Sequence, residues 1–387
     1  MDFKLSDDQA ELQRSARRVA QEVYRPVAGE WDKASTLLPD VERKRLASLG
    51  YLGVALPTEY GGGGGSLLDA LLVLEELGKE CLPAAFCVFE ANVGAARVIE
   101  LFGTEEQRQR WLPAIVEGEQ TMAVSISEPD AGSAATDMTT RATQQGDEIV
   151  LQGTKRWCSG AGHAELYLVY CRMSDAPGAK GIGAVVVERG TPGFTFGDRE
   201  SLMGFRGVAS ADMYFDDCRV PAENVVVGPG GFGKLFGAFS IERLGNATMS
   251  LAVAAACLER SAAYVLEREQ FGRRIADFQG VQISLAEMVM RTEASRLLLW
   301  RAAHNAGRGM PSALEASVAK CFANETARAV ADLSVQLFGG YGYSTEFSLE
   351  RYMRDSVGWA IAGGTPNMQR TRIAAEYLGV RFDQRRG

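Results

Sequence analysis

The chain has 387 residues, of which 46% are apolar and 23% are charged, and it carries a formal net charge of −8. This length exceeds the usual ~100–200 residues per domain, so we expect two or three modules and a large buried core. The negative charge and the scattered arginines exclude non-specific nucleic-acid binding, because nothing would neutralise phosphates over a wide face.

Helical periodicity dominates residues 1–120. The segments 6–9 and 104–107 have the capping-box form that opens a helix. Apolar side chains between positions 12 and 23 then follow a helical stripe. The five consecutive glycines at 61–65 predict a flexible loop.

Short strands separated by glycine turns replace this pattern in residues 121–232. Regularly spaced strands of this kind predict a compact β-barrel or sandwich, with candidate strands at 148–153, 165–173, 183–188 and 211–217. The segment 218–233 contains two prolines and four glycines and is interpreted as the linker out of this module.

Long helical periods return in residues 233–387, and that length suits a four-helix bundle. The predicted architecture is therefore α, β, α in chain order. In fold-class terms it is α+β, because the helices and strands fall in separate modules.

Residues 1–20 lack the apolar core of a signal peptide, and no stretch approaches the ~18 uncharged apolar residues of a membrane span. The seven cysteines are scattered and form no Cys-x-x-Cys pair, so we expect them to be reduced. We therefore expect a cytoplasmic protein without membrane insertion.

The chain has two histidines, His163 and His304, and neither has a metal-ligand neighbour at helical or loop spacing. This pattern disfavours a histidine zinc site and a Ser-His-Asp triad. We expect no metal, and we expect the chemistry to depend on carboxylates or on a cofactor.

The segment Gly228–Lys234 matches a GxGxxG pattern and nearly matches a phosphate-binding Walker loop. Leu235 stands where the Walker loop needs Ser or Thr, and no βαβ unit follows. A linker loop is favoured, with a nucleotide-binding protein as the alternative from another class.

Four motifs are more specific, and in this order they closely resemble the acyl-CoA dehydrogenase family over essentially the whole chain. They are ISEPDAGS at 126–133, KRWCSG at 155–160, REQFG at 268–272 with Phe278-Gln279, and QLFGGYG at 336–342 with Arg354-Asp355 after it. The resemblance implies an N-terminal helical domain, a central β-barrel and a C-terminal four-helix bundle. It also implies FAD as cofactor, an acyl-CoA substrate, a homotetramer and electron-transfer flavoprotein as electron acceptor.

The resemblance assigns cofactor contacts to matching positions. It implies that Trp157 packs its indole beside the isoalloxazine and that Ser159 aims a hydroxyl at the reactive flavin nitrogen. Arg268 and Phe271 would hold the pyrophosphate and adenosine end, which a neighbouring subunit approaches with its own glycines. The full set of implied contacts is Ile126, Ser127, Gly132, Ser133, Trp157, Ser159, Arg268, Phe271, Gln336, Gly339, Gly340, Thr365 and Asn367, with Ser133 also meeting the thioester. Electron-transfer flavoprotein would dock near Trp157.

Dehydrogenation needs a carboxylate beside the weakly acidic α-proton of the thioester, in an apolar site. Most of the family carry that glutamate where this chain has Gly363, but Glu242 matches the position used by the isovaleryl-CoA and long-chain branches. Helical spacing independently places one carboxylate on an otherwise uncharged stripe, which consists of Leu235, Phe239, Glu242, Asn246 and Met249. We predict that Glu242 is the base and that Arg243 supports the coenzyme A or the site wall. The alternative is a glutamate paired with an arginine of another helix.

The sequence leaves the identity of the acyl group open. Glu90 matches a residue that closes the acyl pocket in medium-chain relatives, and Arg97 follows seven positions later on the same helical side. A polar floor of these two residues would accept a branched, cyclic or distally carboxylated chain; alternatively, both are solvated. Family membership also leaves other reactions open, namely those of a desulfinase, an enoyl-CoA reductase or an oxidase.

Overall fold

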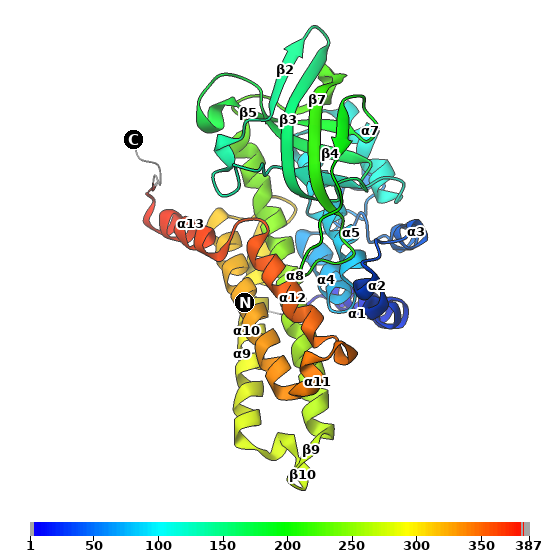
Figure 1. The fold of residues 1–387 in the computed structure, drawn as a ribbon, viewed down its shortest axis with the longest axis vertical. Coiled ribbons are helices and arrows are strands. Elements are labelled where there is room, and N and C mark those ends of the chain that lie inside the picture. The colour runs from blue at the N-terminus through cyan, green and yellow to red at the C-terminus, as the bar shows by residue number, and fades with distance from the viewer. Residues whose placement is uncertain (1–3, 381, 383–387) are drawn as a thin grey trace.

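The computed structural model describes residues 4–380 and 382, and its elements follow the predicted order of helices, strands and helices (Figure 1). The predicted capping boxes are present at Ser6 and Thr104. A π-helical turn, Ala20–Tyr24, follows the first helix. The N-terminal helices are α1 (Asp7–Val19), α2 (Arg25–Ala34), α3 (Asp40–Ser48), α4 (Leu67–Gly78), α5 (Leu82–Asn92), α6 (Ala95–Phe102) and α7 (Glu105–Val116).

The glycine run at 61–65 is a packed turn, so the prediction of a flexible loop is wrong. Backbone amides of Gly64 and Gly65 donate to the carbonyl oxygens of Leu56 and Val54 at 2.9 and 2.8 Å. A Cβ at Gly62 would lie 2.2 Å from the oxygen of Leu56. Close backbone approach, rather than freedom of movement, requires glycine here.

The β domain is one sheet with the strand order β6-β7-β3-β2-β4-β5-β8, and β1 pairs in parallel with β4. Its strands are β1 (Met122–Ser125), β2 (Arg141–Gln145), β3 (Glu148–Ser159), β4 (Leu166–Arg172), β5 (Ile182–Glu188), β6 (Phe194–Phe196), β7 (Ser210–Pro221) and β8 (Val225–Val227). The segment predicted as a linker therefore contains the end of β7 and the whole of β8, which pairs with β5.

Alternation along β4 divides its side chains between two cores. Tyr167, Val169 and Cys171 belong to the core inside the β domain. Leu168 and Tyr170 belong to the larger core that the strands share with the helices. One face of this strand thus looks toward the helical part of the molecule.

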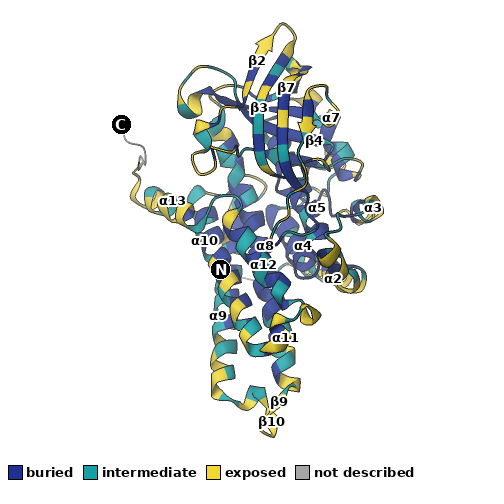
Figure 2. Cartoon of the chain, in the orientation of Figure 1, coloured by how far each residue is buried: buried dark blue, intermediate teal, exposed yellow. Residues whose placement is uncertain are grey.

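The C-terminal helices form a bundle around α8, which runs through the centre of the molecule and is mostly buried in its middle (Figures 1 and 2). The helices are α8 (Phe232–Glu267), α9 (Gln279–Ala306), α10 (Ala313–Phe338), α11 (Gly340–Tyr343), α12 (Leu349–Ile361) and α13 (Pro366–Leu378). A short hairpin of β9 (Glu269–Gln270) and β10 (Arg273–Arg274) lies at the lower tip in Figure 1.

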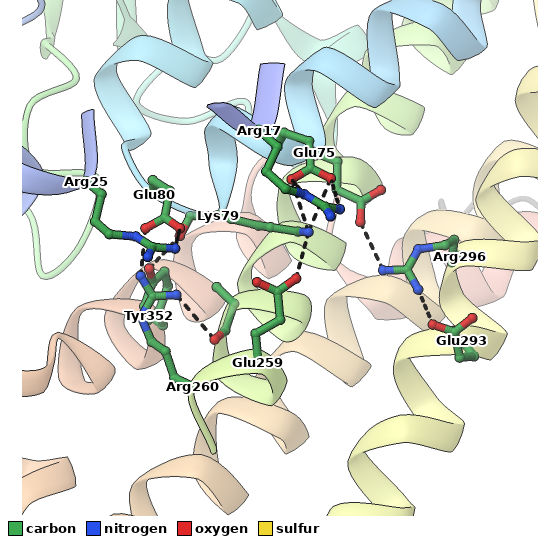
Figure 3. A network of polar contacts seen from close by, with 12 residues as sticks. Arg17, Arg25, Glu75, Lys79, Glu80, Glu259, Arg260, Glu293, Arg296 and Tyr352 are labelled. Carbon is green, nitrogen blue, oxygen red and sulfur yellow. Dashed lines mark hydrogen bonds and ion pairs between the residues drawn. The ribbon is translucent and has the colours of Figure 1, made fainter. Parts of the chain in front are cut away.

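Ion pairs, each with one buried partner, join the N-terminal helices to this bundle (Figure 3). Glu80, two residues after the end of α4, accepts from Arg25 at 2.5 Å and from Arg260 of α8 at 2.7 Å. Lys79 donates to Glu259 of α8 at 2.8 Å. These contacts fix α8, and therefore the residues it carries, against the N-terminal domain.

Two segments, Leu82–Phe102 and Phe232–Glu267, are long and apolar enough to cross a bilayer by length and composition alone. Within this fold, 83% and 61% of their most apolar windows are buried against the rest of the protein. They serve as core helices here.

All seven cysteines are free and buried.

Candidate active site

Glu242 lies on α8 on one face with Phe239 and Asn246, as predicted. Its carboxyl makes no hydrogen bond or ion pair with any residue of the described chain, so the alternative of an arginine partner from another helix is wrong. The side chain keeps some exposed surface. Enough protein surrounds it, however, that burial raises its pKa to about 8, against the opposing charges of Arg243 and Lys320.

Gly363, the usual base position of the family, opens into the same space. A Cβ there would lie 3.4 Å from Cε of Lys320, 3.8 Å from a ring carbon of Phe239 and 3.9 Å from Nδ2 of Asn246. Phe239 and Asn246 flank Glu242 by about one turn of α8. A carboxylate can therefore reach one location from either position, which gives a geometric reason for the exchange.

Lys320 is fully buried on α10 and supports this loop. Its Nζ donates to Oδ1 of Asn324 and to the carbonyl oxygen of Gly364, both at 2.9 Å. Asn324 donates to Asn246 at 2.9 Å, and Asn246 donates to two backbone oxygens at the end of α12. Burial lowers the pKa of Lys320 to about 7. The network ties α8, α10 and the loop after α12 together around Glu242.

Arg243 is nearly fully buried, and its guanidinium lies 4.8 and 5.2 Å from the ring centroids of Phe236 and Phe239. Its Nε and Nη1 have no hydrogen-bond partner among residues 4–380 and 382. Burial, with a contribution from Arg372, lowers its pKa to about 10. This unpaired cation forms part of the wall beside Glu242.

Glu90 and Arg97 are both buried, so the alternative that they are solvated is wrong. Arg97 does not join Glu90, however, because α5 ends between them and a new helix begins. Arg97 instead donates to two backbone oxygens, of Ala55 and Arg308. The predicted shared helical side is therefore wrong, and Glu90 alone remains near Glu242.

The β side of the site forms at the end of β3. A bulge opposite β7 gives Trp157 a left-handed backbone with φ +61°, a strained conformation for a bulky residue. The indole is 52% exposed, and the guanidinium of Arg156 lies 4.3 Å from its centroid. The Arg156 amide donates to the carbonyl of Ser127 at 2.9 Å. This bond ties Ser127 to the strand that carries Trp157 and Ser159.

A buried ion pair organises the adjoining loop. Nζ of Lys155 donates to Oε1 of Glu128 at 2.9 Å and to the carbonyl oxygen of Ile126 at 3.0 Å. Oε2 of Glu128 accepts from the amide of Thr139 at 2.6 Å. The loop between these anchors presents Gly132 and Ser133 as exposed residues. Besides Trp157 itself, five residues of the predicted cofactor set lie in this loop or on β3, namely Ile126, Ser127, Gly132, Ser133 and Ser159.

A second group of predicted residues lies elsewhere. Arg268, Gln336, Gly339 and Gly340 line one cavity of about 580 Å³. A Cβ added at Gly339 or Gly340 would meet nothing within 4 Å, and the neighbouring Phe271 is 94% exposed. This cavity lies beside the β9–β10 hairpin at the lower tip of the molecule, whereas β3 belongs to the sheet in its upper part (Figure 1). The predicted cofactor residues of one chain therefore fall into two separate groups.

The remaining predicted contacts follow Gly363. Thr365 caps α13, where its hydroxyl accepts from the amide of Met368 at 3.4 Å. Asn367 accepts from Arg370 at 3.1 Å and is exposed. Both lie at the start of α13, next to the loop that faces Glu242.

The glycine loop at 228–234 is a turn into α8. The amide of Gly231 donates to the carbonyl of Gly228 at 3.1 Å, and a Cβ at Gly231 would lie 2.0 Å from Val227. The strand before it, β8, is antiparallel to β5. This arrangement is not the parallel βαβ unit of a dinucleotide fold, and it agrees with the linker interpretation.

Models of the acyl-CoA dehydrogenase N-terminal, middle and C-terminal domains match residues 6–119, 123–218 and 230–378. The chain belongs to the acyl-CoA dehydrogenase family. Members of this family are FAD-dependent enzymes, and FAD is the cofactor of this one. The two groups of predicted cofactor residues fit it, because an arginine beside bare glycine backbone suits a pyrophosphate and an exposed indole suits a flat ring system.

Relatives within the acyl-CoA dehydrogenase family differ in the reaction their names describe. The chain is 40% identical to 3-sulfinopropanoyl-CoA desulfinase from Paraburkholderia xenovorans, with 99% of each covered. It is 37% identical to acryloyl-CoA reductase (NADH) from Anaerotignum propionicum, with 98% of this chain and 96% of that one covered. The solved butyryl-CoA dehydrogenase from Megasphaera elsdenii superposes with a TM-score of 0.94 at 34% identity, covering 98% and 100% of the two chains.

Three functional features were missed from the sequence. Lys155 lies within a quoted motif, but its buried pairing with Glu128 has no signal in spacing. Lys320 could have been found as a lone lysine in an alanine-rich helical stripe. Tyr170 gave no signal, because alternation along β4 does not say which face meets the helices.

Proposed function

We propose that the chain catalyses the FAD-dependent α,β-dehydrogenation of an acyl-CoA to its trans-2-enoyl-CoA, with Glu242 removing the α-proton. The observation that carries this proposal is the unpartnered carboxyl of Glu242, placed where a carboxylate from Gly363 would also reach. A structural glutamate would be expected to have a cationic or hydrogen-bonding partner in so enclosed a place.

The physical chemistry of Glu242 suits a base for a weak carbon acid. A carboxylate freed from hydrogen bonds binds its proton more strongly, and burial raises the pKa of Glu242 to about 8. Arg243 and Lys320 keep the ionised form accessible, since their positive charges oppose that shift. FAD, when bound, supplies the acceptor for the β-hydride. Residues of the chain then have to hold the thioester and exclude water.

We also propose a homotetramer in which each FAD is held by two chains. The two groups of predicted cofactor residues lie apart in one chain, so a partner must complete each site. An exposed apolar surface on α9 supports association through that helix, and it includes Ile283, Val289, Met290 and Leu297. Electron-transfer flavoprotein is the proposed acceptor, docking near the exposed Trp157, and the proposed location is the cytoplasm.

The test is an anaerobic titration of the FAD-loaded protein with saturated acyl-CoAs of different lengths. Dehydrogenation predicts bleaching of the flavin and one enoyl-CoA per FAD reduced, identified by mass spectrometry. If no saturated acyl-CoA bleaches the flavin, the proposal fails. Oxidation of reduced flavin by an enoyl-CoA would then indicate a reductase, and release of sulfite from 3-sulfinopropanoyl-CoA would indicate a desulfinase.

A further inference from the structure

A loop of the β domain, residues 201–208, leaves the sheet between β6 and β7 and lies against the helices. Its Phe205 packs on the core that the helices share, not on the core inside the β domain. The backbone of Phe205 is left-handed, with φ +56°. A bulky residue in this region is strained, and it persists only where the surrounding contacts over-determine it. The 201–208 loop is therefore held by its contacts rather than by its own conformational preference.

Helix α12 provides several of these contacts. The amide of Phe205 donates to Oδ1 of Asp355 at 2.8 Å, and Asp355 is buried. Arg354 donates to the carbonyl oxygen of Met203 at 3.2 Å. A Cβ at Gly204 would lie 2.8 Å from the carbonyl oxygen of Arg354, so the two backbones approach closely only because glycine stands there. The Arg354-Asp355 pair of the sequence motif thus serves to dock this loop.

The N-terminal domain holds the other side of the 201–208 loop. A Cβ at Gly207 would lie 2.7 Å from the carbonyl oxygen of Thr36 and 2.6 Å from Cγ of Pro83. Arg354, which binds the loop, also donates to Asp32 of α2 at 2.6 Å. All three domains therefore meet at this loop.

The ring of Phe205 connects this junction to the active site. Its centroid lies 4.5 Å from that of the buried Trp359, near the end of α12. The carbonyl oxygens of Trp359 and Ala362 both accept from Nδ2 of Asn246, at 3.0 and 3.2 Å. Asn246 follows Glu242 by about one turn of α8. A ring of the β domain therefore bears on the segment that leads into the turn facing Glu242.

We propose that Phe205 is a positioning residue, which acts through Trp359 to hold the turn at residues 362–364 in register with Glu242. A Cβ at Gly363 would open into the space around Glu242, so this turn forms a wall of the site, and its displacement would change where the thioester lies relative to the carboxyl. A small misplacement of reacting groups slows the reaction far more than it weakens binding. The inference rests on the proposed function for the reaction that is slowed, whereas the placement of the turn does not depend on it.

The first test follows flavin reduction by stopped flow in FAD-loaded Phe205→Ala, with butyryl-CoA, octanoyl-CoA and hexadecanoyl-CoA as probes. We expect the limiting rate to fall about 10-fold, while the acyl-CoA concentration that gives half of this rate changes less than about 2-fold. Phe196→Ala is the matched control, because Phe196 is another half-buried ring of the β domain but packs on the core inside it. The control should keep the wild-type rate. A wild-type rate in Phe205→Ala, or weaker binding with an unchanged limiting rate, would overturn the proposal.

Gly358 allows the same contact to be tested from α12. A Cβ at Gly358 would lie 2.7 Å from a ring carbon of Phe205, so Gly358→Ala should displace the ring and slow flavin reduction as Phe205→Ala does. In the double variant no ring remains to be displaced, and Gly358→Ala should add no further loss. Alanine favours a helix more than glycine does, so the substitution does not weaken α12 itself. Losses that add in the double variant would contradict the proposed contact.

Hydrogen exchange of the FAD-loaded protein without substrate separates this inference from the dehydrogenation proposal. Amides of residues 359–365 should exchange faster in Phe205→Ala and in Gly358→Ala than in the wild type or in Phe196→Ala. Unchanged exchange in this segment would overturn the positioning role even in an active enzyme. If no acyl-CoA reduces the wild-type flavin but the exchange differs as expected, the dehydrogenation proposal fails and the placement of the turn by Phe205 stands.

Discussion

Nζ of Lys320 lies 2.9 Å from the carbonyl oxygen of Gly364, so a buried ammonium on α10 is tied to the loop that faces Glu242. Its charge favours the carboxylate form of Glu242. Replacing Lys320 by Met should therefore raise the pKa of Glu242 above about 8. Since the carboxylate is the active form, the rate of flavin reduction should fall by about 10-fold near neutral pH and recover as the pH rises. Stopped-flow flavin absorbance across a pH series measures this shift.

Lys320→Gln separates charge from loop support. The Gln amide can still donate to a carbonyl but carries no charge. It should therefore show the same alkaline shift as Lys320→Met. A wild-type pH profile in Lys320→Gln would mean that the lysine acts only by holding the loop.

The Glu128–Lys155 pair should contribute strongly to stability. Lys155→Met leaves a buried carboxylate without its cation, which costs about 3–5 kcal/mol of unfolding free energy. The pKa of Glu128 is lowered to about 2, so the wild-type contribution is complete above about pH 4.5 and is lost as the pH falls toward 2. Denaturant unfolding measures both effects. As a control, Arg14→Met breaks the exposed pair with Glu11 and should cost less than about 1 kcal/mol; an equal cost would contradict the account.

The order of modules and the position of Glu242 could be predicted because both depend on periodicity along one chain segment. The stripe from Leu235 to Met249 gives the face of α8 directly. The glycine run at 61–65 was misjudged because its requirement is tertiary: Leu56 and Val54 approach its backbone. Arg97 was predicted on the same helical side as Glu90, but the helix is interrupted after α5. The interruption changes the direction of the side chains that follow it.

The polar lining of the site could not be predicted, for a related reason. Tyr170 and Lys320 come from β4 and α10, which are far from Glu242 along the chain, and both interact electrostatically with it. Such contacts between distant segments depend on how the domains assemble, and one sequence does not encode them as a local pattern. The motifs gave the cofactor residues only through family resemblance.

Sharing of FAD between chains predicts complementation. Arg268→Met should weaken retention of FAD at one half-site, and Trp157→Ala with Ser159→Ala should impair the other. Neither variant protein alone should retain FAD fully after desalting. When the two are co-expressed, mixed oligomers should regain some intact sites, because each site combines halves from different chains.

The ratio of FAD to protein after desalting measures this recovery. Co-expression of the Arg268→Met chain with a tagged copy of itself is the control and should give none. Pull-down through a tag on one chain confirms that mixed oligomers have formed. If such oligomers show no recovery of FAD, a shared site is contradicted.

The central claim is that Glu242 removes the α-proton, and the most direct measurement is anaerobic flavin reduction by Glu242→Gln. Glu259→Gln, which alters a glutamate on the same helix in the ion-pair network of Figure 3, is the matched control. We predict that Glu242→Gln retains FAD and binds acyl-CoA but reduces its flavin about 100–10,000-fold more slowly, whereas Glu259→Gln stays close to wild type. Reduction by Glu242→Gln at the wild-type rate would contradict the account.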